Sequence, residues 1–118
     1  MTMYYDKHGY AIVHLQNKHL FDMKGKPVAF IYNKAVYNLR GKLLGYAENG
    51  WLRDKQNRAV LYTDNHSGFG PLPPVHRIPP IPAVPAIPPI PPIPPIPPIP
   101  PVASYSWSTL SADAYFNQ

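Results

Sequence analysis

Proline sets the first constraint on the fold of this chain. Of the 18 prolines, Pro27 stands alone and the other 17 fall in one tract. Because proline has no backbone N–H to donate, residues 71–102 can form neither an α-helix nor a central β-strand. Residues 1–70 have an ordinary globular composition. The sequence therefore predicts a β-repeat domain (1–70), a polyproline II arm (71–102) and a C-terminal anchoring segment (103–118).

Within the arm, an apolar residue recurs at every third position. We call these eleven residues the stripe: Leu72, Val75, Ile78, Ile81, Val84, Ile87, Ile90, Ile93, Ile96, Ile99 and Val102. The positions between them are almost all proline, and polyproline II has three residues per turn, so the stripe forms one straight ridge. The arm spans roughly 90 Å at ~3.1 Å per residue, which is longer than a small domain is wide. It must therefore wrap, project or bind a neighbour.

The stripe indicates a role beyond that of a spacer. Proline-rich tracts are commonly disordered linkers, but a solvated linker gains nothing from a ridge of aliphatic side chains. We expect the stripe to pack on the aromatic surface of the chain's own β domain or that of a neighbouring subunit, in a homo-oligomer or larger assembly. The alternative is that the tract is a ligand displayed to a foreign Pro-recognising partner or an exported surface complex.

Turn-forming residues repeat every sixteen positions in the first 70 residues. One series is Asn17, Asn33, Asn49 and Asn65; a second is Asp6, Asp22, Asn38 and Asp54, followed three residues later by Gly9, Gly25, Gly41 and Asn57. Asx-x-x-Gly favours a type I turn that the Asx side chain caps, and Asn-Gly or Asn-Lys favours a hairpin corner. Registration over four units indicates a repeat fold.

The segments between these turns are short, apolar and alternating, as in β-strands. We predict an all-β, compact up-and-down meander of eight strands near residues 3–6, 10–16, 19–22, 26–32, 35–38, 42–48, 51–54 and 58–63. In strict alternation Ile12 shares a face with His14, and Val13 faces the other way with Leu15. Both faces are apolar, so the arm, the C-terminal segment or another subunit is expected to cover the second face.

The C-terminal segment is polar with large apolar residues interspersed. Trp107, Leu110, Ala114 and Tyr115 approximate helical spacing, although the stretch is short and Ser-rich. We expect an ordered plug anchored by Trp107, Tyr115 and Phe116.

The repeat of Asx-x-x-Gly turns and apolar hairpins in four copies resembles the four-fold β-flower family of small bacterial domains. The resemblance covers roughly residues 3–66 and implies a compact, pseudo-four-fold, all-β unit. It supplies no catalytic residues, and the Ile-Pro-Pro tract is not part of the repeat pattern on which it rests.

Charge and chemistry narrow the function classes. The net charge is +5, and residues 1–70 account for it with ten Lys/Arg and five Asp/Glu. These basic residues are scattered singly, which is typical of a solvated surface, so nucleic-acid binding by the basic β domain is a less favoured alternative. The N-terminus has no cleavable signal, and polyproline leaves carbonyls unpaired in lipid, so we expect a soluble chain without membrane insertion, either cytoplasmic or exported without a leader.

No catalytic or metal-binding pattern is present. The chain has no cysteine, its five histidines (His8, His14, His19, His66 and His76) lack metal-ligand spacing, and no GxSxG or Gly-rich phosphate loop occurs. The Asx series at one end of the domain offers a ring of oxygens for a cation, but each residue is needed to cap its own turn. We therefore expect a non-enzymatic structural and interaction protein with no cofactor or metal.

Overall fold

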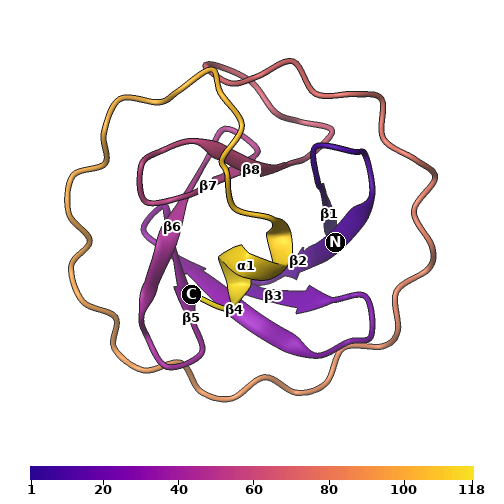
Figure 1. Cartoon of the computed structure of the whole chain (residues 1–118). Coiled ribbons are helices and arrows are strands. Elements are labelled where there is room, and N and C mark those ends of the chain that lie inside the picture. The colour runs from indigo at the N-terminus through magenta and orange to yellow at the C-terminus, as the bar shows by residue number, and fades with distance from the viewer.

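The computed structural model describes residues 1–118, and its eight antiparallel strands close into a barrel in sequence order (Figure 1). The strands are β1 (Thr2–Tyr5), β2 (Ala11–Gln16), β3 (His19–Asp22), β4 (Pro27–Tyr32), β5 (Ala35–Asn38), β6 (Leu43–Glu48), β7 (Trp51–Arg53) and β8 (Ala59–Tyr62). The predicted all-β, up-and-down meander is therefore confirmed. None of the helical structure has the length and hydrophobicity needed to cross a membrane.

The Asx turns at one end of the barrel share one geometry. The Asp22 side chain accepts hydrogen bonds from the backbone N–H groups of Lys24 and Lys26, both at 2.9 Å. Gly25 completes the turn with a φ of 85°, in the left-handed region that favours glycine. The same pair of bonds recurs at Asp6, Asn38 and Asp54. Each Asx side chain thus caps the turn in which it lies.

Hairpin corners lie at the other end of the barrel. Asn17, Asn33 and Asn49 adopt positive φ values of 55°, 50° and 54°, as tight hairpins require. The interpretation of Asn65 as a fourth corner is wrong, because no ninth strand follows β8 and Asn65 lacks a positive φ. Its backbone N–H instead bonds to the Thr63 hydroxyl at 3.2 Å, in the loop that leads to the arm.

Each repeat also contains one β-bulge. Tyr4 pairs with Val13 and Tyr5 pairs with Ala11, so Ile12 has no partner across the sheet. The same register shift leaves Val28, Leu44 and Val60 unpaired in the following repeats. The extra residue breaks the alternation, so that a bulged residue and the one after it both reach the barrel core. The expectation that Ile12 shares a face with His14 is wrong for this reason.

The C-terminal segment enters the barrel at the Asx end. Helix α1 (Ala112–Phe116) lies at the centre of the ring of strands (Figure 1). Ser111 caps it by accepting a hydrogen bond from the N–H of Ala114. Tyr115 is fully buried in the main core cluster and donates its hydroxyl to the Arg53 carbonyl at 2.9 Å. We call residues 103–118 the plug.

The plug also reinforces the seam where the barrel closes. β1 and β8 share a single paired position, Tyr5 with Tyr62. Beside this seam, Ala59 forms a parallel bridge with Trp107. The N–H of Ala59 donates to the Ser106 carbonyl at 3.2 Å, and the N–H of Ser108 donates to the Ala59 carbonyl at 2.7 Å. The sheet is therefore extended at its weakest junction by residues that follow the arm in sequence.

The arm wraps around the outside of the barrel. In Figure 1 it leaves β8, encircles all eight strands and returns to the same side before the chain enters the barrel as the plug. The molecule measures 35 × 34 × 22 Å, so its rim is roughly 100 Å around, close to the ~90 Å contour of the arm in polyproline II. The arm therefore wraps around its own barrel and does not project from it.

Candidate functional site: the arm and its stripe

The outer wall of the barrel beneath the arm is aromatic. Its side chains are buried although they face away from the barrel core: Phe21, Phe30, Tyr37, Tyr46 and Tyr62 are all at most 6 % exposed. Phe30 and Tyr37 form one small cluster, and Tyr62 belongs to another with Tyr5 and Trp51. The arm thus covers the outer face of the sheet while the plug covers the inner face.

Tyrosine hydroxyls hold the arm by its carbonyl groups. Tyr62 and Tyr37 donate to the carbonyls of Pro74 and Pro95, both at 2.8 Å. Tyr46 donates to the carbonyl of Pro98 at 3.3 Å. Polyproline II makes no internal hydrogen bonds, so these carbonyls are free to accept. Burial raises the pKa of the Tyr37 and Tyr62 hydroxyls, which therefore stay protonated donors.

The few interruptions of the proline pattern supply backbone donors to the Asx turns. The N–H of Arg77 donates to the Gly9 carbonyl, and the N–H of Ala86 donates to the Gly25 carbonyl, each at 2.9 Å. The N–H of Ala83 reaches the Met23 carbonyl at 3.0 Å. Proline at any of these arm positions would remove a donor. The departures from Ile-Pro-Pro are therefore explained by attachment to the barrel.

Close packing at the turn glycines also brings the arm against the barrel. A Cβ on Gly25 would overlap the Val84 carbonyl of the arm, and a Cβ on Gly9 would lie 3.1 Å from the Cα of His76. In the fourth repeat Asn57 replaces glycine, and its side-chain amide donates to the Pro101 carbonyl at 2.7 Å. The turn residues thus serve the barrel and the arm together.

One histidine fastens the start of the arm. The His76 ring stacks on Tyr5 with centroids 3.8 Å apart and planes within 7°. Its Nε2 lies 2.8 Å from a carboxylate oxygen of Asp64. Beside it, the Arg77 guanidinium lies over the ring of Tyr10, 4.5 Å from the centroid.

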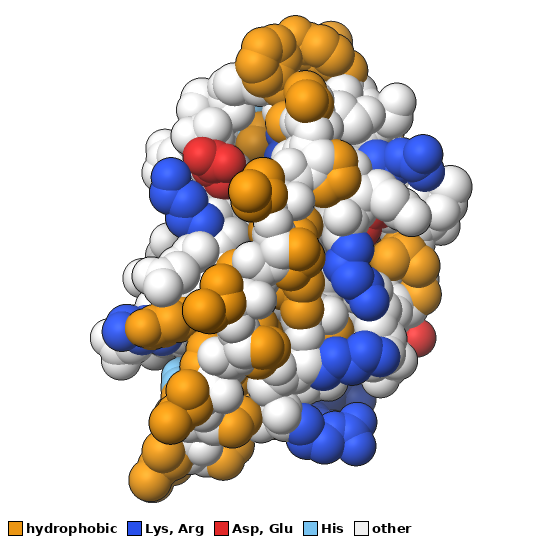
Figure 2. Space-filling model, turned by 90° about the vertical axis from the view of Figure 1, so that its left-hand side faces the viewer, with side chains coloured by type: hydrophobic (Ala, Val, Ile, Leu, Met, Phe, Trp, Pro, Cys, Tyr) orange, Lys and Arg blue, Asp and Glu red, His pale blue; other side chains and the backbone are white.

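The stripe itself faces solvent. All eleven of its side chains are between 89 % and 97 % exposed. The expectation that the stripe packs on the chain's own β domain is wrong. Prolines that follow stripe residues turn towards the barrel instead, as Pro79, Pro82, Pro85 and Pro88 show by their partial burial. If the branched side chains of the stripe lay between the arm and the barrel, they would hold the arm's carbonyls away from the tyrosine hydroxyls. Figure 2 shows the resulting apolar band, which runs from the top of the view to its lower left.

The fold gathers basic residues that are scattered in sequence. Seven of the eleven Lys and Arg residues lie on the four Asx turns: Lys7, Lys24, Lys26, Arg40, Lys42, Lys55 and Arg58. All seven are exposed, as expected of a solvated surface, and the sixteen-residue period brings these positions to one end of the barrel. None of the seven forms an ion pair. Figure 2 shows Lys and Arg side chains in a row beside the apolar band.

Two histidines lie in the outer wall, of which His14 is fully buried and His19 half-buried. His14 and His19 each leave Nε2 without a hydrogen-bond partner. The rings pack against Phe21, with centroids 5.6 Å and 6.3 Å away. Burial lowers the pKa of both imidazoles. No three His, Asp or Glu side chains come together in a way that would hold a metal ion.

Sequence reasoning missed the attachment of the arm. The sequence predicts only a generic aromatic surface where the tyrosines bind the arm, and the non-proline residues Arg77, Ala83 and Ala86 have no role in that prediction. A usable signal was present, since tyrosine hydroxyls on a buried strand face need acceptors and proline carbonyls need donors.

A comparison with protein-family models gives one match. The model of a family described as 4-fold beta flower protein matches residues 2–116. The match includes the arm and most of the plug, so the expectation that the resemblance covers only residues 3–66 is too narrow. No curated protein and no solved structure matches the chain.

Proposed function

The chain belongs to the 4-fold beta flower protein family, and from this premise we propose that it is a non-enzymatic structural and interaction protein whose arm displays the stripe to a partner protein. One observation carries the proposal: the arm is fixed to the barrel along its length, yet its eleven aliphatic side chains remain between 89 % and 97 % exposed. Contiguous apolar surface of this extent on a soluble protein marks an interaction site.

The attachment of the arm makes the stripe a prepared surface. Hydroxyls from three tyrosines and backbone donors from Arg77, Ala83 and Ala86 fix its course around the barrel. A partner that binds the stripe therefore does not have to order a disordered peptide. Pre-organisation of this kind lowers the entropic cost of binding.

The curvature of the stripe decides the shape of the partner. Burying one Ile, Val or Leu side chain stabilises a complex by about 1.5–3 kcal/mol, whereas association costs about 4–15 kcal/mol. Two convex rims touch over only a few side chains, which leaves little net gain. A concave protein surface that follows the arm buries many more. We therefore propose a partner with a concave apolar collar, and not a second copy placed rim to rim.

Site-specific photo-crosslinking in cells of the native host tests the proposal. A photoreactive residue replaces Ile81, Ile90 or Ile99 on the stripe. The control position is Lys34, which lies off the stripe at a hairpin corner. We expect all three stripe positions to give a discrete product that joins the chain to one other protein, identified by mass spectrometry, and Lys34 to give none. Products that contain only further copies of the chain would replace the foreign partner with self-assembly, and an absence of products at all three positions would refute the proposal.

A matched variant separates binding from folding. Ile90→Asp with Ile96→Asp changes only exposed side chains, so we expect an unchanged Tm. The same double variant is expected to abolish the product formed from position 81. An unchanged yield of that product would show that the stripe is not the contact surface.

The basic end of the barrel supports a second candidate, binding of nucleic acid. Seven Lys and Arg residues without ion pairs share this end, which favours contact with phosphates. Fluorescence polarisation with labelled single- and double-stranded DNA and RNA should then give an affinity that falls steeply between about 50 and 200 mM salt. No binding at the lower salt concentration would remove this candidate.

A further inference from the structure

The mouth of the barrel at the Asx end is only half filled by the plug. The four bulged residues are equivalent in the repeat, but their burial differs. Leu44 and Val60 are 0 % and 5 % exposed, whereas Ile12 and Val28 are only partly buried. The difference arises because the plug packs towards β6, β7 and β8, as the bond from Gln118 to the Leu44 carbonyl shows. The half of the mouth formed by β2 to β5 stays open.

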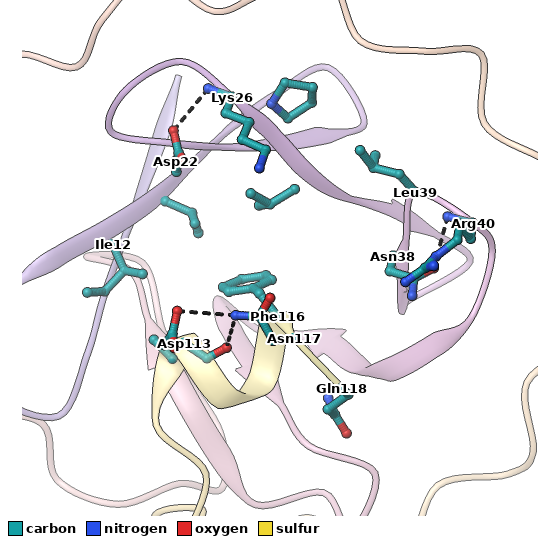
Figure 3. Close-up of a pocket in the computed structure, with 14 residues that line it drawn as sticks. Ile12, Asp22, Lys26, Asn38, Leu39, Arg40, Asp113, Phe116, Asn117 and Gln118 are labelled. Carbon is teal, nitrogen blue, oxygen red and sulfur yellow. Dashed lines mark hydrogen bonds between the residues drawn. The ribbon is translucent and has the colours of Figure 1, made fainter.

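This open half is a pocket of about 580 Å³ between α1 and the first two hairpins (Figure 3). Ile12, Val28, Leu39 and Phe116 give it apolar walls. The size and the mixture of apolar walls with a few polar groups match those of ordinary ligand sites.

The pocket is lined by charged groups of both signs. In Figure 3, Asp22 and Asp113 lie towards one side and Arg40 towards the opposite side, with Phe116 between them. Lys26 also lines the pocket. Neither Lys26 nor Arg40 forms an ion pair. Lys26 lies beside Asp22 and Arg40 lies across the pocket, so the pocket offers two cations for a carboxylate and carboxylate acceptors for donor groups.

The filled half of the mouth shows what kind of molecule the open half accepts. At Asp54, the equivalent of Asp22, the Ser108 hydroxyl of the plug donates to the second carboxylate oxygen at 2.5 Å. Asp22 uses one oxygen to cap its turn, and its other oxygen accepts no hydrogen bond. The plug therefore binds one half of the mouth at Asp54. The other half repeats this site at Asp22, and no segment of the chain binds there.

We propose that the open half of the mouth binds the carboxyl end of a partner peptide that has an apolar last side chain. Lys26 and Arg40 receive the terminal carboxylate, the apolar side chain packs on Ile12 and Val28, and a backbone N–H or hydroxyl of the peptide donates to Asp22. A peptide is favoured over other amphiphilic carboxylates because a peptide, the plug, already fills the equivalent half.

Fluorescence anisotropy with the full chain tests this site. The probe is an N-terminally fluorescein-labelled pentapeptide, Gly-Ser-Gly-Leu-Phe, with a free carboxylate, and its C-terminal amide is the comparison. We expect saturable binding of the acid and binding weaker by about tenfold or more for the amide, because a charge-assisted contact is lost. Equal binding of acid and amide, or no saturable binding of the acid, would overturn the proposal.

Substitutions locate the binding. Lys26→Gln and Arg40→Gln alter exposed side chains on the turns and are expected to weaken binding of the acid by about tenfold together while leaving binding of the amide unchanged. Lys34→Gln, at the opposite end of the barrel, is the matched control. An equal loss with the control variant would reduce the interaction to non-specific charge attraction and overturn the proposed site.

Discussion

Removal of the Tyr115 side chain is the sharpest test of the barrel and plug as one folding unit. Tyr115 is fully buried in the main core cluster, and its hydroxyl donates a hydrogen bond to the carbonyl of Arg53. Tyr115→Ala leaves a cavity the size of an aromatic ring, which costs about 3–5 kcal/mol in well-packed cores. Tyr115→Phe keeps the ring and removes the hydrogen bond to the Arg53 carbonyl, which costs about 0.5–1.5 kcal/mol.

These losses are large against the total. A domain of this length has a free energy of unfolding of roughly 6–18 kcal/mol at ~0.05–0.15 kcal/mol per residue. Tyr115→Ala should therefore remove a quarter or more of the stability. Urea unfolding followed by tryptophan fluorescence measures the change, because Trp51 and Trp107 report on the outer wall next to the plug. Tyr105→Phe is the control, since Tyr105 is 65 % exposed and donates no hydrogen bond.

The reasoning fails if Tyr115→Ala costs less than about 1 kcal/mol, below the range for any buried aromatic. It also fails if Tyr115→Ala and Tyr115→Phe have equal effects, since the ring and the hydroxyl make separate contributions. A separate early transition in urea for the wild-type chain would show that the plug leaves before the barrel unfolds.

Three further outcomes are expected. Gly25→Ala should lower the Tm by several degrees in differential scanning fluorimetry, because alanine is strained at a φ of 85° and its Cβ would overlap the arm; an unchanged Tm would contradict the close approach. Tyr37→Phe should cost about 1 kcal/mol in urea unfolding through loss of the bond to the Pro95 carbonyl, and no loss would contradict that attachment. Burial lowers the pKa of His14 and His19 in the folded state, so the unfolded chain binds more protons and stability should fall as the pH drops below about 6.5. His14→Gln with His19→Gln should flatten that pH dependence, and an unchanged slope between pH 7 and 5 would contradict it.

The sequence predicted the meander of eight strands, though not its closure into a barrel, because its period is local. Each repeat carries its own Asx cap and hairpin corner, so the ends of the strands could be placed from turn chemistry alone. The bulges could not be predicted in this way. Ile12 and Val13 are both apolar, and two adjacent apolar residues fit strict alternation between two apolar faces as well as they fit a bulge. Only the pairing with Tyr4 and Tyr5 distinguishes the two arrangements.

The orientation of the arm escaped prediction for a different reason. The hydrophobicity of an isoleucine ridge favours its removal from water. It does not determine which side of the arm faces the barrel. The direction is set by hydrogen bonds: tyrosine hydroxyls on the barrel need acceptors, and the proline carbonyls of the arm are the acceptors within reach. The pocket escaped prediction as well, because it exists only where the plug fails to cover two of four equivalent strand pairs.

The single paired position between β1 and β8 has a consequence for the order of folding. Seven hairpin contacts join neighbouring segments of the chain, and such contacts form in about 1–10 µs. Closure of the barrel joins residues nearly sixty positions apart, and the bridge from Ala59 to Trp107 adds contacts across a loop of similar length. Long loops close late because their ends must first meet. The strands should therefore assemble as an open, curved sheet, and the passage of the arm around it should be the step that closes the ring.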